Sequence, residues 1–532
     1  MEKSFLFVDV TNPTWLAYVA FLVIAVFFRF GRILTIRNLD LTLLLLLSTA
    51  IVVAGVYRNA PFEKPQAPPG SSEEVLTTTL PDGTLSASAP DLVNLAVTDA
   101  SSVDEAKRDD TTESLETAAA AVPERVSHPV YQWATFTLMG LTLLLLLRLG
   151  FDESFTRRPR LDQNLNQAGI TFLCIPAFAI LMISVLTKSP EGSTFKAVEH
   201  GRALLQRRDV QVDPQTEHSE HPAPTETLIA AGGAAMAQLS GNLPKSQADN
   251  PESELNVTAW LARIFVVVAH TLVVLGLLSI AKQHFASLQI GISMSCLYLL
   301  LPCTAVNVHE LNHVLPAACL IWAIASYRNP VVSGILLGLA SGTLFFAAFL
   351  LPLWAVFYGR NGGVRFVVSV LGITAVLITS LLMISGDASS FTNKLVSTAN
   401  WTVYRLLDDS ATATDASLSQ LFIRIPMAAV FFVMLTAMTV LPRPRNLENL
   451  LANSTCLVVA AQMWYPDDIG TYVLWYLPLF LIVIFRPRLD RFTPPESAER
   501  ESSITAPPVS NPLIPTVTVS EMSLFRSQSP AS

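Results

Sequence analysis

The residues best suited to chemistry form one short pattern, His309-Glu310-Leu311-Asn312-His313. It has the H-E-x-x-H spacing of zinc metalloproteases, in which two imidazoles four residues apart on one helix bind Zn²⁺ while the glutamate polarises a water. Against this, Pro316 disturbs the helix that would hold the ligands in register, and no further His or Asp follows nearby as a third ligand. A polar loop that caps the next apolar segment is the simpler interpretation, so no metal ligand is assigned.

A second candidate site depends on position. The segments 303–313, 386–420 and 465–469 are expected on one outer face, and all three bring acids, with aromatic residues in the last two. Such a surface suits a sugar or a polar headgroup, because a carboxylate can act as general base while rings stack on the substrate. The plain alternative is that the acids are solvated and the rings sit at a membrane interface. The candidate catalytic residues are Glu310, Asp467 and Asp468, and the candidate substrate contacts are His309, His313, Arg263, Trp401, Trp464 and Tyr465.

The elements that must position these residues are apolar segments. The chain has 532 residues, of which 51% are hydrophobic and only 14% charged, whereas soluble proteins have roughly 25% charged residues. A helix needs about 20 apolar residues to cross a bilayer, and we therefore predict an all-α, polytopic integral membrane helical bundle. The predicted spans are 14–28, 41–57, 129–149, 168–187, 258–281, 286–302, 313–327, 364–385, 421–441, 449–464 and 470–485.

The predicted spans number about 11 full spans. Basic residues predict their orientation, since Lys and Arg near span ends stay on the cytoplasmic side. Arginines follow the first, third and last spans, among others. Placing them all inside puts the N-terminus outside and the C-terminus inside, and requires the apolar segment 331–358 to begin and end on the same face. We therefore expect 331–358, which Gly338, Gly342 and Pro352 interrupt, to be a broken, re-entrant helical hairpin. At the start of the second span, Arg37 and Asp40 are expected to pair at the inner interface.

The polar segments between the spans divide the chain. Residues 58–127 carry thirteen acidic residues against five basic ones, and 188–257 carry ten against six. Each has a single aromatic residue, so both are expected to be mostly disordered exterior loops, apart from 194–208, whose spacing fits a helix lying on the membrane surface. The expected divisions are 1–57 (two spans), 58–127, 128–187 (two spans), 188–257, 258–486 (the main membrane domain) and 487–532, a disordered cytoplasmic tail.

Several function classes are excluded or disfavoured. Neither a phosphate-binding G-x-x-x-x-G-K-[ST] loop nor a dinucleotide fingerprint occurs, and the halves show no convincing repeat, which disfavours a secondary transporter. The five cysteines all lie in or beside apolar spans and form no C-x-x-C pair, which indicates buried small side chains. His270, alone within a span, is read as a satisfied core residue. No cofactor is assigned. The carboxylates of the candidate site would suit a divalent cation.

One stretch resembles a known family. It runs Tyr327-Arg328-Asn329-Pro330-Val331-Val332-Ser333-Gly334-Ile335-Leu336-Leu337-Gly338-Leu339-Ala340 and continues through Leu350-Leu351-Pro352 to Gly359-Arg360. It is similar to membrane-embedded GT-C-type glycosyltransferases, most of all to the polyprenyl-phosphate-mannose-dependent branch, where a glycine-rich helix pair forms part of the lipid-linked donor site. The family's Lys and first Pro are missing after Ala340.

The resemblance implies a multi-pass membrane enzyme that transfers a sugar from a polyprenyl phosphate to an envelope acceptor, in the plasma membrane. Its expected partners are membrane lipids and the lipid-linked sugar, with no nucleic acid. Two alternatives stay open on the sequence: a non-enzymatic membrane scaffold whose acidic loops bind envelope partners, and the zinc metalloprotease.

Overall fold

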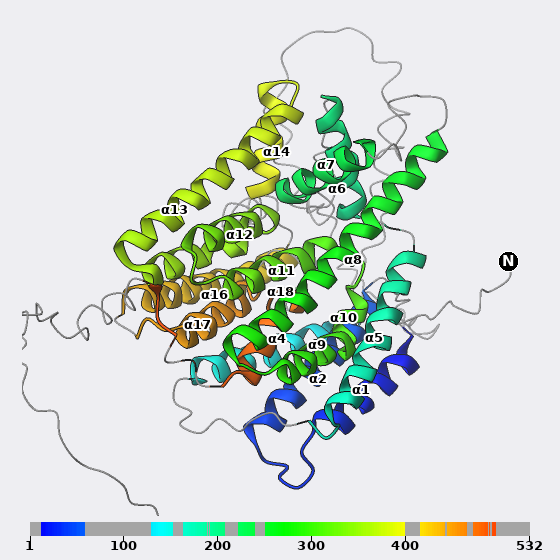
Figure 1. The fold of residues 1–532 in the computed structure, drawn as a ribbon, viewed down its shortest axis with the longest axis vertical. Coiled ribbons are helices and arrows are strands. Elements are labelled where there is room, and N and C mark those ends of the chain that lie inside the picture. The colour runs from blue at the N-terminus through cyan, green and yellow to red at the C-terminus, as the bar shows by residue number, and fades with distance from the viewer. Residues whose placement is uncertain are drawn as a thin grey trace, which may run out of the picture. The chain divides into compact units, whose positions relative to one another are not determined.

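A computed structural model describes residues 12–58, 129–152, 163–188, 190, 192–207, 222–239, 251–399, 415–441, 444–464, 472–487, 489 and 492–495. Every regular element in these residues is helical (Figure 1), so the prediction of an all-helical fold is confirmed. Two compact units divide the chain, Ala50–Thr137 and the remainder, Met1–Thr49 with Leu138–Ser532. The candidate site and all contacts described below lie in the second, larger unit.

Five helical segments are long and apolar enough to cross a membrane: Ile36–Tyr57, Pro129–Gly150, Gln167–Thr187, Asn256–His284 and Phe345–Ile384. Several other apolar helices have only 13 to 15 residues, and at 1.5 Å rise per residue they reach about 20 Å against a hydrocarbon core of about 30 Å. The number of full spans and their sidedness therefore stay predictions.

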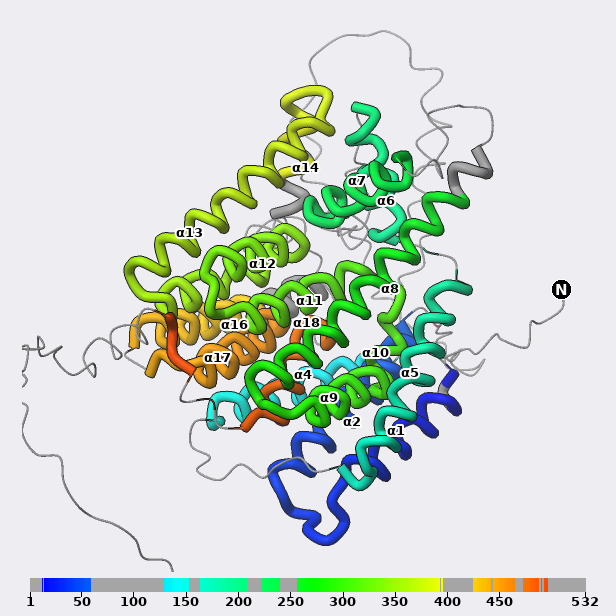
Figure 2. The backbone as a smooth tube through the Cα atoms, viewed as in Figure 1, coloured from blue at the N-terminus to red at the C-terminus, as the bar shows by residue number. Residues whose placement is uncertain are grey.

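Ten of the predicted spans overlap an observed helix, with ends that agree to within seven residues. These helices are α1 (Pro13–Phe27), α2 (Ile36–Tyr57), α4 (Pro129–Gly150), α5 (Gln167–Thr187), α8 (Pro251–His284), α9 (Leu288–Leu300), α11 (Leu311–Ala325), α16 (Asp415–Val440), α17 (Leu447–Ala461) and α18 (Val473–Phe485). Short helices α10 (Pro302–Val306) and α14 (Ala388–Ala399) complete the connections. α18, orange in Figure 2, is buried along almost its whole length among α9, α11 and α17, and it forms the centre of the core.

The apolar segment after Arg328 is broken, as expected. It consists of α12 (Pro330–Thr343), the 3₁₀ helix η3 (Phe345–Leu350) and α13 (Leu351–Ile384), and α13 is itself kinked at Gly359, where φ is 76°. The chain between Tyr327 and Tyr358 returns to its starting point, because the Tyr358 hydroxyl donates a hydrogen bond to the Tyr327 carbonyl at 2.7 Å. Whether this hairpin re-enters a membrane stays a prediction.

The α12 glycines pack against the later part of α13. A Cβ atom on Gly334 would come within 2.6 Å of the Phe366 carbonyl oxygen, and one on Gly338 within 3.1 Å of the Ile373 side chain. Glycines four residues apart form one face of a helix and let two backbones approach closely. The glycine-rich pattern that resembles a lipid-donor site is therefore used here for helix packing.

The range 188–257 differs from the expected disordered loop in three segments, the last of which is the start of α8 at Pro251. α6 (Ser193–Gln206) confirms the helix predicted at 194–208, and α7 (Pro224–Leu239) is a second helix packed against it. Small residues allow this contact: a Cβ on Gly201 of α6 would meet the backbone of Ala231 of α7 at 2.6 Å. The composition argument overlooked α7, because no large apolar side chain is among its buried residues, which are Pro224, Thr225, Glu226, Thr227, Ala230, Ala231 and Ala234.

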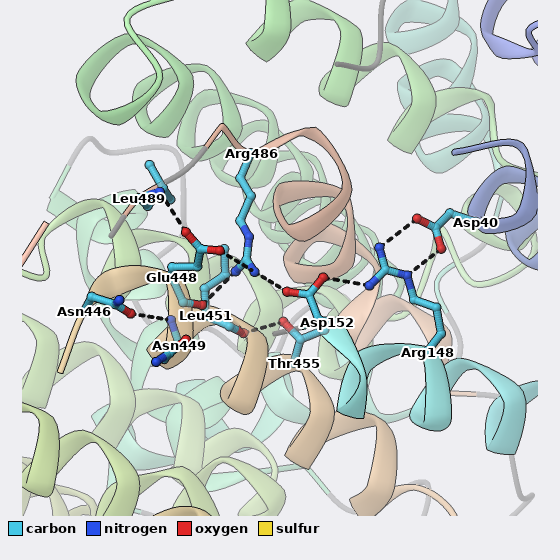
Figure 3. Close-up of polar contacts among 10 residues, drawn as sticks. All are labelled: Asp40, Arg148, Asp152, Asn446, Glu448, Asn449, Leu451, Thr455, Arg486 and Leu489. Carbon is cyan, nitrogen blue, oxygen red and sulfur yellow. Dashed lines mark hydrogen bonds and ion pairs between the residues drawn. The ribbon is translucent and has the colours of Figure 1, made fainter. Parts of the chain in front are cut away.

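A charge network joins segments from both ends of the chain (Figure 3); it comprises Asp40, Arg148, Asp152, Glu448 and Arg486. Arg148 binds Asp40 with two hydrogen bonds, of 2.7 and 2.9 Å, and Asp152 with a third, of 2.7 Å. The other oxygen of Asp152 accepts a hydrogen bond from Arg486, which also donates to the Glu448 carbonyl at 2.7 Å. Asp40 thus pairs with Arg148 and not with Arg37, whose Nη2 donates to the Phe27 carbonyl.

Candidate functional site

The candidate site is built around the start of α11. α10 ends at Val306 and the next helix begins only at Leu311, with Glu310 as its N-cap in an extended conformation (φ −97°, ψ 107°). His309 therefore lies in the turn before the helix, and His313 in its first turn. α11 continues through Pro316, since an internal proline five residues after the helix start removes a hydrogen bond only to the first turn.

The Glu310 and His313 side chains form a close pair. His313 Nε2 lies 2.6 Å from Glu310 Oε2, and the glutamate side chain is 52% exposed whereas that of the histidine is 10% exposed. The i, i+3 spacing on the first helical turn brings the two together. The carboxylate thus stays open to solvent while a buried imidazole holds it in one orientation.

A stack of aromatic rings fixes this imidazole. The His313 ring lies nearly parallel to Tyr472 (centroids 5.3 Å apart, 13°), Tyr472 stacks on Trp475 at 4.1 Å, and Trp475 stacks on Phe346 at 4.5 Å. These rings come from α11, from the start of α18 and from η3. The other ring nitrogen, His313 Nδ1, is buried with no hydrogen-bond partner among the described residues.

The His270 side chain contacts the backbone of the loop before Glu310. Its Nε2 lies 3.0 Å from the Val308 carbonyl oxygen, and its Nδ1 lies 3.0 Å from the Tyr298 hydroxyl. Because a carbonyl can only accept, Nε2 carries the proton and Nδ1 accepts from the tyrosine. Both nitrogens are satisfied, which agrees with the interpretation of His270 as a core residue and adds a role in placing the 308–310 backbone.

The geometry expected for a zinc protease does not form. His309 and His313 do not share one helical face, because the helix begins between them, and His313 Nε2 is engaged by Glu310. Among the residues that the structure describes, no group of three or more His, Cys, Asp or Glu is arranged to hold a metal ion. Burial and the nearby Lys188 ammonium lower the pKa of His309 to about 4, partly offset by Glu310, so this imidazole is neutral at pH 7.

The helix α6 packs against the start of α11. Thr194 Oγ1 accepts a hydrogen bond from the backbone N–H of Leu311 at 3.2 Å. That N–H is one of the first-turn donors that a helix cannot satisfy itself, so α6 caps the helix that carries the Glu310–His313 pair. Arg263, a predicted substrate contact, is half-buried, and its Nε donates to the Lys188 carbonyl at 3.1 Å.

The other predicted site residues divide into two groups. Trp464 is 1% exposed and packs among Phe349, Phe431 and Phe432, so it belongs to the core and offers no surface for a substrate. Trp401, Tyr465, Asp467 and Asp468 lie outside the described residues. The structure thus brings together Glu310 and His313, with His309 adjacent in the chain. Sequence reasoning missed Thr194, Phe346, Tyr472 and Trp475, which reach the site from distant segments.

These features define an all-helical protein compatible with a membrane, with a carboxylate–imidazole pair at the start of a buried helix. No protein-family model, curated protein or solved structure matches this chain.

Proposed function

We propose that the protein is a multi-pass membrane glycosyltransferase that moves a sugar from a polyprenyl phosphate to an acceptor hydroxyl, with Glu310 as general base. The observation that carries the proposal is the half-exposed Glu310 carboxylate held at 2.6 Å by a buried histidine. A base must reach the proton of its substrate and must keep one orientation, and this pair meets both conditions.

The chemical step is a displacement at the anomeric carbon of the sugar. Glu310 takes the proton of the acceptor hydroxyl as the acceptor oxygen bonds to that carbon. The bond from the carbon to the phosphate oxygen breaks, and polyprenyl phosphate leaves with the electron pair. His313 acts as a positioning residue, since its Nε2–H donates to the carboxylate oxygen that does not receive the proton.

The resemblance of 327–360 to the polyprenyl-phosphate-mannose-dependent transferases supports the donor class. It does so through sequence alone, because the α12 glycines face α13 and leave no open glycine surface there. The donor phosphate therefore requires other contacts, and half-buried Arg263 is a candidate among the described residues.

The test is transfer of labelled sugar from a polyprenyl phosphate by purified protein in liposomes. Glu310→Gln removes the base at constant volume and should lower the rate by about 10²- to 10⁴-fold. Glu199→Gln, an identical change at an exposed position on α6, is the matched control and should retain the wild-type rate. Asp467→Asn tests the second predicted acid. An inactive wild-type protein, or an active Glu310→Gln variant, would overturn the proposal.

A further inference from the structure

A second acidic residue has an environment opposite to that of Glu310. Glu226, in the first turn of α7, is 1% exposed, and neither carboxylate oxygen has a hydrogen bond of normal geometry to any residue that the structure describes. Among the described residues, the group that lowers its pKa is the backbone N–H of Ala223, directly before the helix. An ionised carboxylate is strongly destabilised in such a place, because bulk solvent does not reach it and no cation among the described residues lowers its pKa.

α6 and α7 together form a cap on the rest of the larger unit. α7 contacts α12 and α13, and Thr225, next to Glu226, donates from Oγ1 to the Leu339 carbonyl at 2.8 Å. α6 contacts α11 through the Thr194–Leu311 hydrogen bond. Figure 1 shows the two helices side by side, above α12 and beside the upper part of α8. Hence the carboxyl of Glu226 is buried at the base of the same cap that holds the first turn of α11.

We propose that the α6–α7 cap is a proton-controlled latch over the Glu310–His313 pair, closed when Glu226 is protonated and released when it ionises. That the latch regulates catalysis rests on the proposed function, whereas the latch itself does not. Release would free the Leu311 N–H from Thr194 and expose the first turn of α11 on the side that α6 covers.

In the part of the chain that is described, no charged side chain stabilises the ionised form of Glu226 in the closed cap. The elements packed on α7 are α6, α8, α12 and α13. α12 has no ionisable residue. The raised pKa of Glu226 arises from burial and is reduced only by the Ala223 N–H, with no contribution from the ionisable residues of α6, α8 or α13. The described ionisable residues of these helices are Lys196, Glu199, His200 and Arg202 on α6, Arg263, His270, Lys282 and His284 on α8, and Tyr358, Arg360 and Arg365 on α13.

The direction of the pH dependence follows from the two protonation states. Burial raises the pKa of Glu226 from 4.5 to about 8 in the closed cap, and in an open cap the carboxyl returns to its ordinary value. Below pH 4.5 both states are protonated and the cap is most stable. Between pH 4.5 and 8 only the open state ionises, so the opening equilibrium rises about tenfold per pH unit, and above pH 8 it levels off.

Hydrogen–deuterium exchange tests the latch on the full-length protein in lipid nanodiscs at pH 5, 6, 7 and 8. Labelling times are scaled so that the chemical exchange rate is constant. We expect the protection of peptides from α6 and α7 to fall about tenfold per pH unit, while a peptide from buried α18 stays unchanged. Glu226→Gln, which cannot ionise, should stay protected at pH 8, and Glu199→Gln should behave as the wild type.

Two results would overturn the latch: equal α6 and α7 protection in the wild type at all four pH values, or the same pH slope in Glu226→Gln. If that variant does not fold, the wild-type series still decides, and Glu226→Leu is the second variant. The measurement needs no substrate. A protein without transfer activity can therefore still show the latch, and a protein without the latch can still transfer sugar.

Discussion

At the residue scale, His313 has two separable roles. Its ring fills a place in the stack with Tyr472 and Trp475, and its Nε2 holds Glu310. The two roles can be divided by substitution, because phenylalanine retains a flat ring and lacks the nitrogen.

We expect His313→Phe to lower the transfer rate strongly and the free energy of unfolding by about 1 kcal/mol, the contribution of one hydrogen bond. His313→Ala should lower both, with a stability loss of about 3 kcal/mol, because it also leaves a cavity in the ring stack. Denaturant unfolding of detergent-solubilised variants, together with the liposome assay, measures the two effects. Equal stability losses in the two variants would contradict the separation of roles.

The candidate site could be predicted from the sequence only in part, for reasons visible at single residues. The pairing of Glu310 with His313 follows from their spacing on a helical turn. Tyr472 and Trp475 could not be assigned, since only tertiary packing brings α18 beside α11. Trp464 was misplaced because an aromatic residue at the end of an apolar run looks the same whether it faces an interface or the core.

At the scale of elements, the close contact of α12 with α13 makes a matched pair of glycine substitutions informative. A Cβ atom at Gly334 would collide with the Phe366 carbonyl, whereas one at Gly372 on α13 would meet nothing within 4 Å.

Gly334→Ala should therefore destabilise the protein by about 1–3 kcal/mol through overpacking. Gly372→Ala should stabilise it by up to about 1 kcal/mol, since alanine is the better helix former. Thermal unfolding in detergent gives opposite signs for the two variants if the helices pack as described. Destabilisation by Gly372→Ala of the same size as at Gly334 would show that the contact is elsewhere.

The helices themselves were largely predictable, because an apolar run of about 20 residues leaves the backbone few alternatives in a membrane. α7 was not, because alanine and glycine give a weak hydropathy signal and bury well only against another helix. The start of α11 was also not predictable to the residue, and that boundary decides whether His309 and His313 share a face.

At the scale of the whole molecule, the charge network connects helices that are far apart in sequence. Arg148 pairs with Asp40 and Asp152, and Arg486 pairs with Asp152 and Glu448. All five side chains lie in a largely buried region. Removal of one partner from a buried ion pair leaves an uncompensated charge, which is more costly than removal of both partners.

Arg486→Gln should lower the free energy of unfolding by about 3–5 kcal/mol, and Asp152→Asn in the same chain should restore part of that loss. A double-mutant cycle on these two positions, measured by denaturant unfolding, gives the coupling. Additive losses in the double variant would mean that the two side chains do not interact.

The same network has a consequence for biosynthesis. Asp40 and Asp152 leave the ribosome early, whereas Arg486 is made only after α18, which itself occupies the centre of the core. Until α18 is inserted and Arg486 is made, Asp152 lacks one of its two arginines, and α9, α11 and α17 lack their common packing partner. Synthesis of Arg486 is therefore the event that completes the charge network. A chain that stops before it should present the cell with a carboxylate that lacks one of its two arginines and with an open bundle, two features by which an unfinished membrane protein can be distinguished from a finished one.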